Sequence, residues 1–126
     1  MDNQEEINAI NIQLVALFIV LFADIISIVT TYNQKLDLEN KETMFESKEL
    51  FKITLFNRIL ILVLSFVFLY VNYKLYNISK KEGEDLKTYS LQIVASLLVI
   101  ASGFIALYVV KLSDTENIVD VENPII

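Results

Sequence analysis

Three long apolar blocks, at about residues 12–32, 53–76 and 89–112, constrain this chain more than any other feature of its sequence. Each block is near the roughly 20 residues that a helix needs to cross a hydrocarbon core about 30 Å thick. The segments between the blocks are charged, whereas 55% of the 126 residues are hydrophobic and the mean hydropathy is +0.53. The pattern predicts an all-α membrane protein whose three transmembrane helices form a small bundle.

The first apolar block differs from a secretory signal peptide in both charge and length. The residues before it include Asp2, Glu5 and Glu6 but no Lys or Arg, and the block is longer than the apolar region of a signal peptide. We therefore expect a retained span. The predicted organisation is a three-span membrane domain at residues 1–113, followed by an acidic, mobile tail at residues 114–126.

The two connecting segments carry signals for helix ends. Thr43 and Glu46 have the spacing of a capping box, which predicts a helix that starts near Met44 and extends the second span. A solvated helical extension is the favoured interpretation of these residues, and an amphipathic stem at the interface is the alternative. Gly83 is placed to end one helix in a left-handed conformation, and Asp85 is placed to cap the next. We therefore expect a helical hairpin between the second and third spans.

Each predicted span has one face of small or polar residues that recur every three or four positions. Hydrocarbon leaves little hydrophobic force between helices, so association in lipid depends on close backbone approach at such residues and on hydrogen bonds between them. The stripe predicted to pack the bundle consists of Ala16, Ala23 and Ser27 in the first span, Ser65 in the second, and Ser96 and Gly103 in the third.

Two ionisable residues interrupt the apolar blocks at similar depths. Asp24 is the only acid within a predicted span, and Arg58 lies in the second span at nearly the same distance from the same side of the bilayer. An unpaired charge near a helix centre costs about 2.5 to 3.5 kcal/mol on insertion scales. We therefore predict an intramembrane ion pair between Asp24 and Arg58 that joins the two helices. A role in an ion path or a proton relay is the alternative.

The composition supplies few residues for catalysis or for metal binding. The chain has no His, no Cys and two Gly, so it lacks the commonest acid–base residue, thiolate ligands and a Gly-rich phosphate loop. Its net charge of −6 argues against nucleic acid as a partner, because phosphate binding requires clustered Lys and Arg. We expect no enzymatic activity, no cofactor and no metal site.

These features together predict a small non-catalytic integral membrane protein that acts through helix packing, as an accessory or regulatory component of a membrane complex. Its expected partners are the lipid bilayer and either further copies of itself or a larger membrane complex. The alternative is a self-oligomerising pore. In size and number of spans the chain is similar to the small three-span holins of phages, whose tails are usually basic, whereas this tail is acidic.

The positions of the basic residues predict an orientation in a cell membrane. The side that holds the first loop and the carboxyl end carries more Lys and Arg than the other side, so the amino end is expected outside and the carboxyl end in the cytoplasm. The basic residues are Lys35, Lys41, Lys48, Lys52, Arg58 and Lys111 on the first side, and Lys74, Lys80, Lys81 and Lys87 on the other. The abundance of Ile, Asn and Lys is typical of an AT-rich, bacterial genome.

Overall fold

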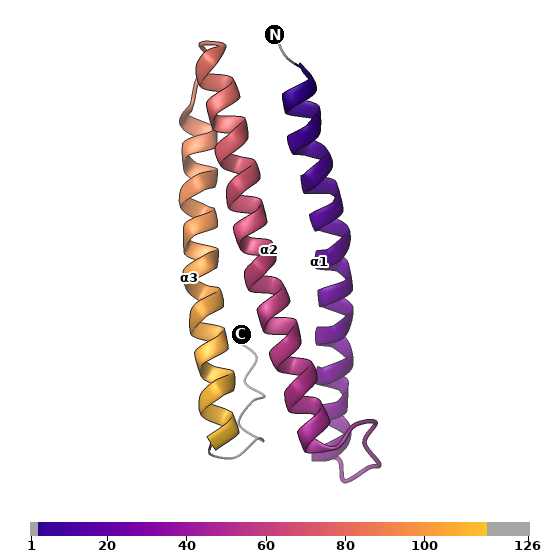
Figure 1. The fold of residues 1–126 in the computed structure, drawn as a ribbon. Helices are drawn as coiled ribbons and strands as arrows, with labels where there is room; N and C mark the ends of the chain where they lie inside the picture. Colours follow the sequence, from indigo (N-terminus) through magenta and orange to yellow (C-terminus); the bar gives the residue numbers. More distant parts are fainter. Residues whose placement is uncertain (1–2, 116–126) are drawn as a thin grey trace.

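The computed structural model describes residues 3–115, which form three antiparallel helices joined by two short turns (Figure 1). The helices are α1 (Asn3–Leu38), α2 (Ser47–Lys81) and α3 (Lys87–Thr115). α2 packs along both neighbours, whereas α1 and α3 hardly touch each other. The predicted all-α fold with three membrane-spanning helices is confirmed. Of the predicted acidic tail, residues 116–126 lie outside the described residues.

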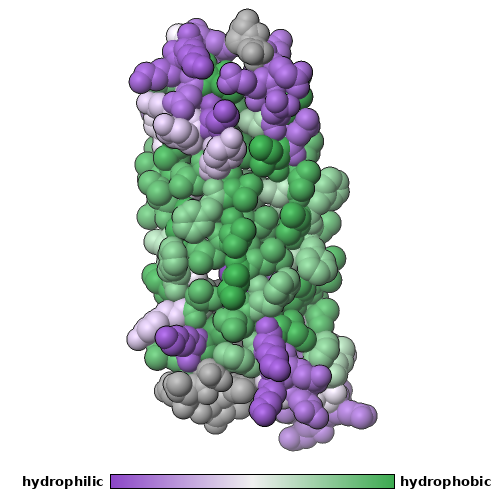
Figure 2. Space-filling model, viewed as in Figure 1, coloured by the Kyte–Doolittle hydropathy of each residue, from purple (hydrophilic) through white to green (hydrophobic). Residues whose placement is uncertain are grey.

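All three helices are long and apolar enough to cross a membrane, with mean hydropathies of 2.7, 2.1 and 2.6 in their most apolar windows. Only 11% of the α1 window, and 22% of each of the other two, is buried inside the structure, so the apolar side chains mostly face outward. Figure 2 shows this surface as a broad hydrophobic band between two hydrophilic ends. This is the surface of a small multi-pass membrane protein, because such a band is stable against lipid and not against water.

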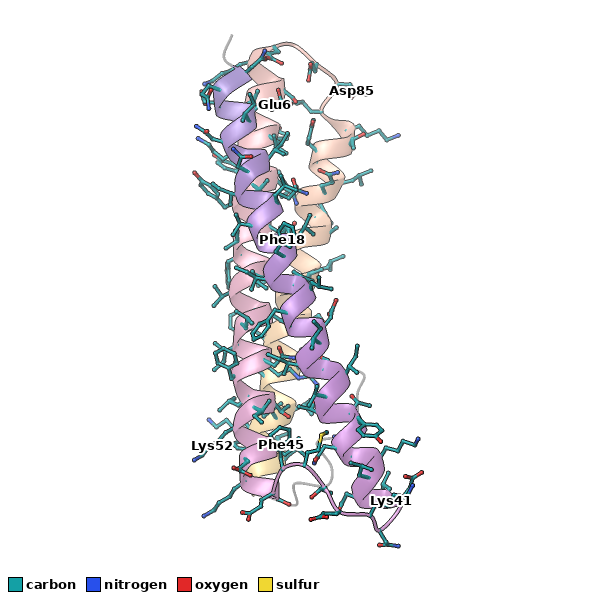
Figure 3. The ribbon with its side chains drawn as sticks, turned by 90° about the vertical axis from the view of Figure 1, so that its right-hand side faces the viewer. Glu6, Phe18, Lys41, Phe45, Lys52 and Asp85 are labelled. Atoms are coloured by element: carbon teal, nitrogen blue, oxygen red, sulfur yellow. The ribbon has the colours of Figure 1, made fainter. Side chains whose placement is uncertain are left out.

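The helices extend beyond the apolar blocks at both ends. α1 contains 36 residues and is about 54 Å long at 1.5 Å per residue, well above the hydrocarbon thickness of about 30 Å. In Figure 3, Glu6 and Asp85 lie at one end of the bundle and Lys41 and Lys52 at the other, with Phe18 on α1 between them. Each helix therefore extends beyond its predicted span at both ends, and α1 is longer than the hydrocarbon core is thick.

The turn between α1 and α2 corrects one prediction. α2 begins at Ser47 with Glu46 as its N-cap, and the capping box joins Glu46 to Glu49 instead of Thr43 to Glu46. The Thr43 hydroxyl donates to the carbonyl of Phe45 at 3.1 Å, which keeps residues 43–45 in the turn. The Glu49 carboxylate accepts a hydrogen bond from the backbone N–H of Glu46 at 3.2 Å, which closes the box at the start of α2. The extension of the second span is therefore shorter than predicted, and it is continuous with α2.

The buried side chain of Asn33 holds this turn against α1. Its Oδ1 accepts hydrogen bonds from the backbone N–H groups of Met44 at 2.8 Å and Phe45 at 3.0 Å. Two residues after α1, Asn40 adopts the left-handed region at φ 59°, and the N–H of Lys41 donates to the carbonyl of Leu36 at 2.9 Å. Asn is among the few non-glycine residues that adopt this conformation readily. The turn is thus closed by two Asn residues.

The turn between α2 and α3 follows the prediction. Gly83 has φ 72° and ends α2, while the N–H of Glu84 bonds the carbonyl of Ser79 at 3.0 Å, as in a Schellman motif. Asp85 Oδ1 accepts a hydrogen bond from the N–H of Lys87 at 3.0 Å, at the start of α3. These contacts reverse the chain within a few residues, so α3 returns alongside α2.

The interface between α1 and α2 has a seven-residue repeat on each helix. Among the buried residues, Ala9, Ala16 and Ala23 in α1 recur every seven positions, and so do Leu50, Asn57, Leu64, Val71 and Ile78 in α2. A strict seven-residue repeat is typical of antiparallel or parallel helices that wind around each other with a left-handed twist. Because the α1 residues are all Ala, the two backbones approach closely, and larger side chains of α2 fill the space between them.

The interface between α2 and α3 includes a close approach of Gly103 to Leu62. A Cβ atom built on Gly103 would lie 2.9 Å from Leu62 Cδ1, so no side chain fits there without movement. Nearby, the rings of Phe66 and Phe104 make an edge-to-face contact with centroids 6.3 Å apart. Close backbone approach and one aromatic pair therefore hold this half of the bundle together.

Candidate functional site

A cleft of about 460 Å³ opens where the three helices meet. All three helices contribute to its walls, and the residues share a mixture of small, polar and apolar side chains. Its lining consists of Gln13, Val20, Ala23 and Asp24 from α1, Ile61, Leu64, Ser65, Phe68 and Asn72 from α2, and Gln92, Ala95, Ser96 and Val99 from α3. The cleft lies within the apolar band, since these residues belong to the three predicted spans.

The cleft exists because α1 and α3 do not close on each other. Both pack on α2 instead, and the side chains that face the gap at Ala23, Ser65, Ala95 and Ser96 are too small to fill it. Ala23, Ser65 and Ser96 are buried at its base, whereas Ala95 is exposed at its edge. The small residues that allow close packing on α2 therefore also leave an unfilled space beside it.

Part of the polar lining is satisfied within the chain. Asn72 Nδ2 donates to Ser96 Oγ at 2.7 Å across the interface between α2 and α3. The Ser65 hydroxyl donates to the carbonyl of Ile61, four residues earlier, at 2.9 Å. Asp24 and Gln92 also line the cleft, and both are exposed. The cleft therefore has a hydrogen-bonded base and polar side chains at its opening.

Arg58 lines a second, neighbouring cavity of about 330 Å³ between α2 and α3. Its Nε is buried and has no hydrogen-bond partner. The second cavity shares Ile61 and Val99 with the cleft, so these two apolar side chains stand between them. Its other lining residues are Ser102, Gly103, Ile105, Ala106 and Val109. Arg58 therefore faces a space next to the one that Asp24 faces.

The predicted ion pair between Asp24 and Arg58 is not formed in the structure of residues 3–115, where the ion pair with N···O within 4.0 Å joins Lys41 to Glu39 at the surface. The reason is angular. Successive residues of a helix point about 100° apart, and it is Asn57, one position before Arg58, that faces α1. Asn57 Nδ2 donates to Ser27 Oγ at 2.9 Å, which turns Arg58 toward α3.

The residues of the predicted packing stripe lie where the helices meet. Ala16, Ala23, Ser65 and Ser96 are buried, Ser27 is bonded to Asn57, and Gly103 contacts Leu62. Three important interface residues were absent from that stripe: Ala9, Asn33 and Asn57. Ala9 and Asn33 lie outside the first apolar block, and Asn57 stands next to the more conspicuous Arg58. The seven-residue spacing of Ala9, Ala16 and Ala23 was the signal that would have found the first.

The cleft can recognise a partner through charge and hydrogen bonding. It presents one carboxylate, three side-chain amides and two hydroxyls within an apolar wall. Within the part of the chain that the structure describes, no group of His, Cys, Asp or Glu is arranged to hold a metal ion. Comparison of the chain with known protein families, with curated proteins and with solved structures finds no match.

Proposed function

We propose that this chain is a small non-catalytic integral membrane protein that acts through helix packing, as an accessory or regulatory component of a membrane complex. One observation carries the proposal. The bundle leaves a polar cleft open sideways between α1 and α3, and Asp24 and Gln92 are exposed at it. A membrane helix that fills this cleft would complete the bundle.

The energetic reason is the cost of polar groups in hydrocarbon. A carboxylate near a helix centre is unfavourable by about 2.5 to 3.5 kcal/mol on insertion scales, and residues of this kind usually face a bundle interior. A helix packed over the cleft exchanges lipid for polar and small side chains, which is how helices associate in membranes. The outward-facing remainder, with residues such as Phe18 and Leu98, needs no partner because lipid solvates it.

The membrane in this proposal is a cell membrane, with the amino end outside and the carboxyl end in the cytoplasm. The support is the excess of Lys and Arg beside the turn between α1 and α2, together with Lys111 near the end of α3. The acidic first turn of α1, with Glu5 and Glu6, adds to the same bias.

A substitution that fills the cleft tests the proposal. Ala95→Phe places a ring in the opening, and Leu98→Phe, on the exposed outer face of the same helix, is the matched control. The measurement is the mass of the particle extracted from the native membrane in polymer nanodiscs. We expect a multi-chain particle for the wild type and for Leu98→Phe, and a smaller one for Ala95→Phe. A wild-type particle that contains this chain alone would rule out the complex.

A self-oligomerising pore of holin-like architecture is the second candidate. The observation that favours it is that each of the three helices places a polar side chain in the cleft: Gln13, Asn72 and Gln92. Rings of such residues around a shared axis line water-filled pores. Release of an entrapped ion from liposomes by the purified protein, reduced by Gln92→Leu, would favour the pore. Intact liposomes at every protein density would favour the accessory function.

A further inference from the structure

We propose that the cleft binds a second copy of this chain, with Asp24 of each copy paired to Arg58 of the other across a two-fold axis along the membrane normal. This inference rests on the proposed function, since it names the first partner in lateral helix packing. It places both intramembrane charges in one interface. It also gives each charge a partner that it lacks within a single copy.

Asp24 and Arg58 both lack a counter-charge within one copy. Asp24 is exposed at the opening of the cleft, and no ion pair is recorded for it in residues 3–115. Arg58 has its Nε buried without a hydrogen-bond partner. An unpaired acid and an unpaired base inside the apolar band each cost free energy, and pairing them with each other reduces that cost.

The two charges lie at nearly equal depth in the bundle. The hydrogen bond between Ser27 and Asn57 sets the register of α1 against α2. Asp24 precedes Ser27 by three residues and Arg58 follows Asn57 by one, and the helices are antiparallel, so both are displaced toward the same side. At 1.5 Å per residue, the Cα atoms of Asp24 and Arg58 differ in depth by only about 3 Å.

A symmetric dimer lets both pairs form at once. A two-fold axis along the membrane normal keeps every atom at its own depth, and a two-fold interface uses the same patch on both copies. Asp24 of one copy therefore reaches the level of Arg58 in the other, and the reverse contact forms at the same time. Within one copy, Ile61 and Val99 stand between the two cavities. Between copies, the carboxylate approaches Arg58 from outside the bundle.

The experiment mixes two variants that each lack one member of the pair. Because the chain has no cysteine, Lys41→Cys in the exposed turn provides one site for a donor or acceptor dye. Asp24→Asn and Arg58→Gln are then studied alone and mixed in phosphatidylcholine vesicles, by energy transfer as a function of the protein-to-lipid ratio. Lys52→Gln, which neutralises an exposed charge near the start of α2, is the matched control. Circular dichroism confirms that each variant is helical.

We expect the wild type and Lys52→Gln to associate, and each neutralised variant alone to associate about tenfold more weakly, because it strands two like charges in the interface. The mixture restores association. Its mixed dimer contains one complete pair, from Arg58 of the first variant and Asp24 of the second, and leaves no charge unpaired. A pair formed within one copy predicts no such recovery, so a mixture no tighter than its components would overturn the proposal.

Two further results separate this inference from the proposed function. A wild type that shows no energy transfer at any protein density is monomeric, and the dimer is then wrong even if Ala95→Phe still reduces the mass of the native particle. Recovery in the mixture together with a native particle that contains only two copies supports the dimer, and it removes the larger complex from the proposed function.

Discussion

At the scale of single residues, Asn is the side chain that joins this bundle across its interfaces. Asn57 bonds Ser27 between α1 and α2, and Asn72 bonds Ser96 between α2 and α3. Interhelical hydrogen bonds of this kind contribute about 0.6 kcal/mol on average in membrane proteins. Their larger role is to select one register, because sliding a helix by one residue leaves a buried amide without its partner.

Asn33 gives a prediction for the turn between α1 and α2. Asn33→Ala removes the acceptor for the N–H groups of Met44 and Phe45, and we expect a loss of about 1–3 kcal/mol in the free energy of unfolding. Proteolysis at Lys41 should become faster, since the turn is released from α1. Asn33→Asp keeps an acceptor oxygen and is the control. Equal cleavage of the wild type and Asn33→Ala would show that the contact does not hold the turn.

At the scale of the helices, α2 is the organising element. One of its faces repeats every seven residues against the Ala positions of α1, while residues one position later, Arg58 and Asn72, face α3. The helix thus offers two adjacent stripes separated by about 100°. Its two partners pack on these stripes, and the cleft is the space that remains between them.

Gly103 gives a prediction for the packing of α2 against α3. Gly103→Leu inserts a side chain where even a Cβ lies 2.9 Å from Leu62, so we expect destabilisation of about 1–3 kcal/mol from overpacking. Val94→Leu, on the exposed face of α3, is the control. It also enlarges a side chain, and we expect no change in the free energy of unfolding. The measurement is unfolding in mixed detergent micelles. Adding Leu62→Ala to the Gly103→Leu variant should restore part of the lost stability. If it does not, the contact between positions 103 and 62 is not the cause of the loss.

At the scale of the whole molecule, the polarity of the surface decides where the protein resides. The apolar band in Figure 2 extends across the face shown, and hydrophilic side chains lie at its two ends. Three spans place the start of α1 and the end of α3 on opposite sides of the membrane. The two turns are likewise on opposite sides.

Single cysteines introduced into this cysteine-free chain test that topology. We expect a membrane-impermeant maleimide to label Asn3→Cys and Glu84→Cys from one side of intact cells, and Lys41→Cys only after permeabilisation, as the predicted orientation requires. Lys111→Cys should behave like Lys41→Cys. Labelling of Asn3→Cys and Lys41→Cys from the same side would contradict a first span that crosses the membrane.

Particular residues show how far sequence reasoning reached. Gly83 and the three apolar blocks were interpreted correctly, because left-handed turns and membrane insertion depend on local chemistry that a short window contains. The start of α2 was misplaced by three residues, because the pairs Thr43–Glu46 and Glu46–Glu49 have the same spacing and the surrounding turn chooses between them. The shared depth of Asp24 and Arg58 was predicted from counting residues, and it agrees with the register set by Ser27 and Asn57.

The sequence by itself therefore determined that this chain forms three apolar helices with small residues on their facing sides, since hydrocarbon requires every backbone group to be bonded within a helix. Only the tertiary structure decided how those helices are rotated about their axes. That rotation brings Asn57 and not Arg58 against α1, and it keeps α1 apart from α3. The physical reason is that rotation follows from the sum of many interhelical contacts, each worth a fraction of a kcal/mol, and no short stretch of sequence contains that sum.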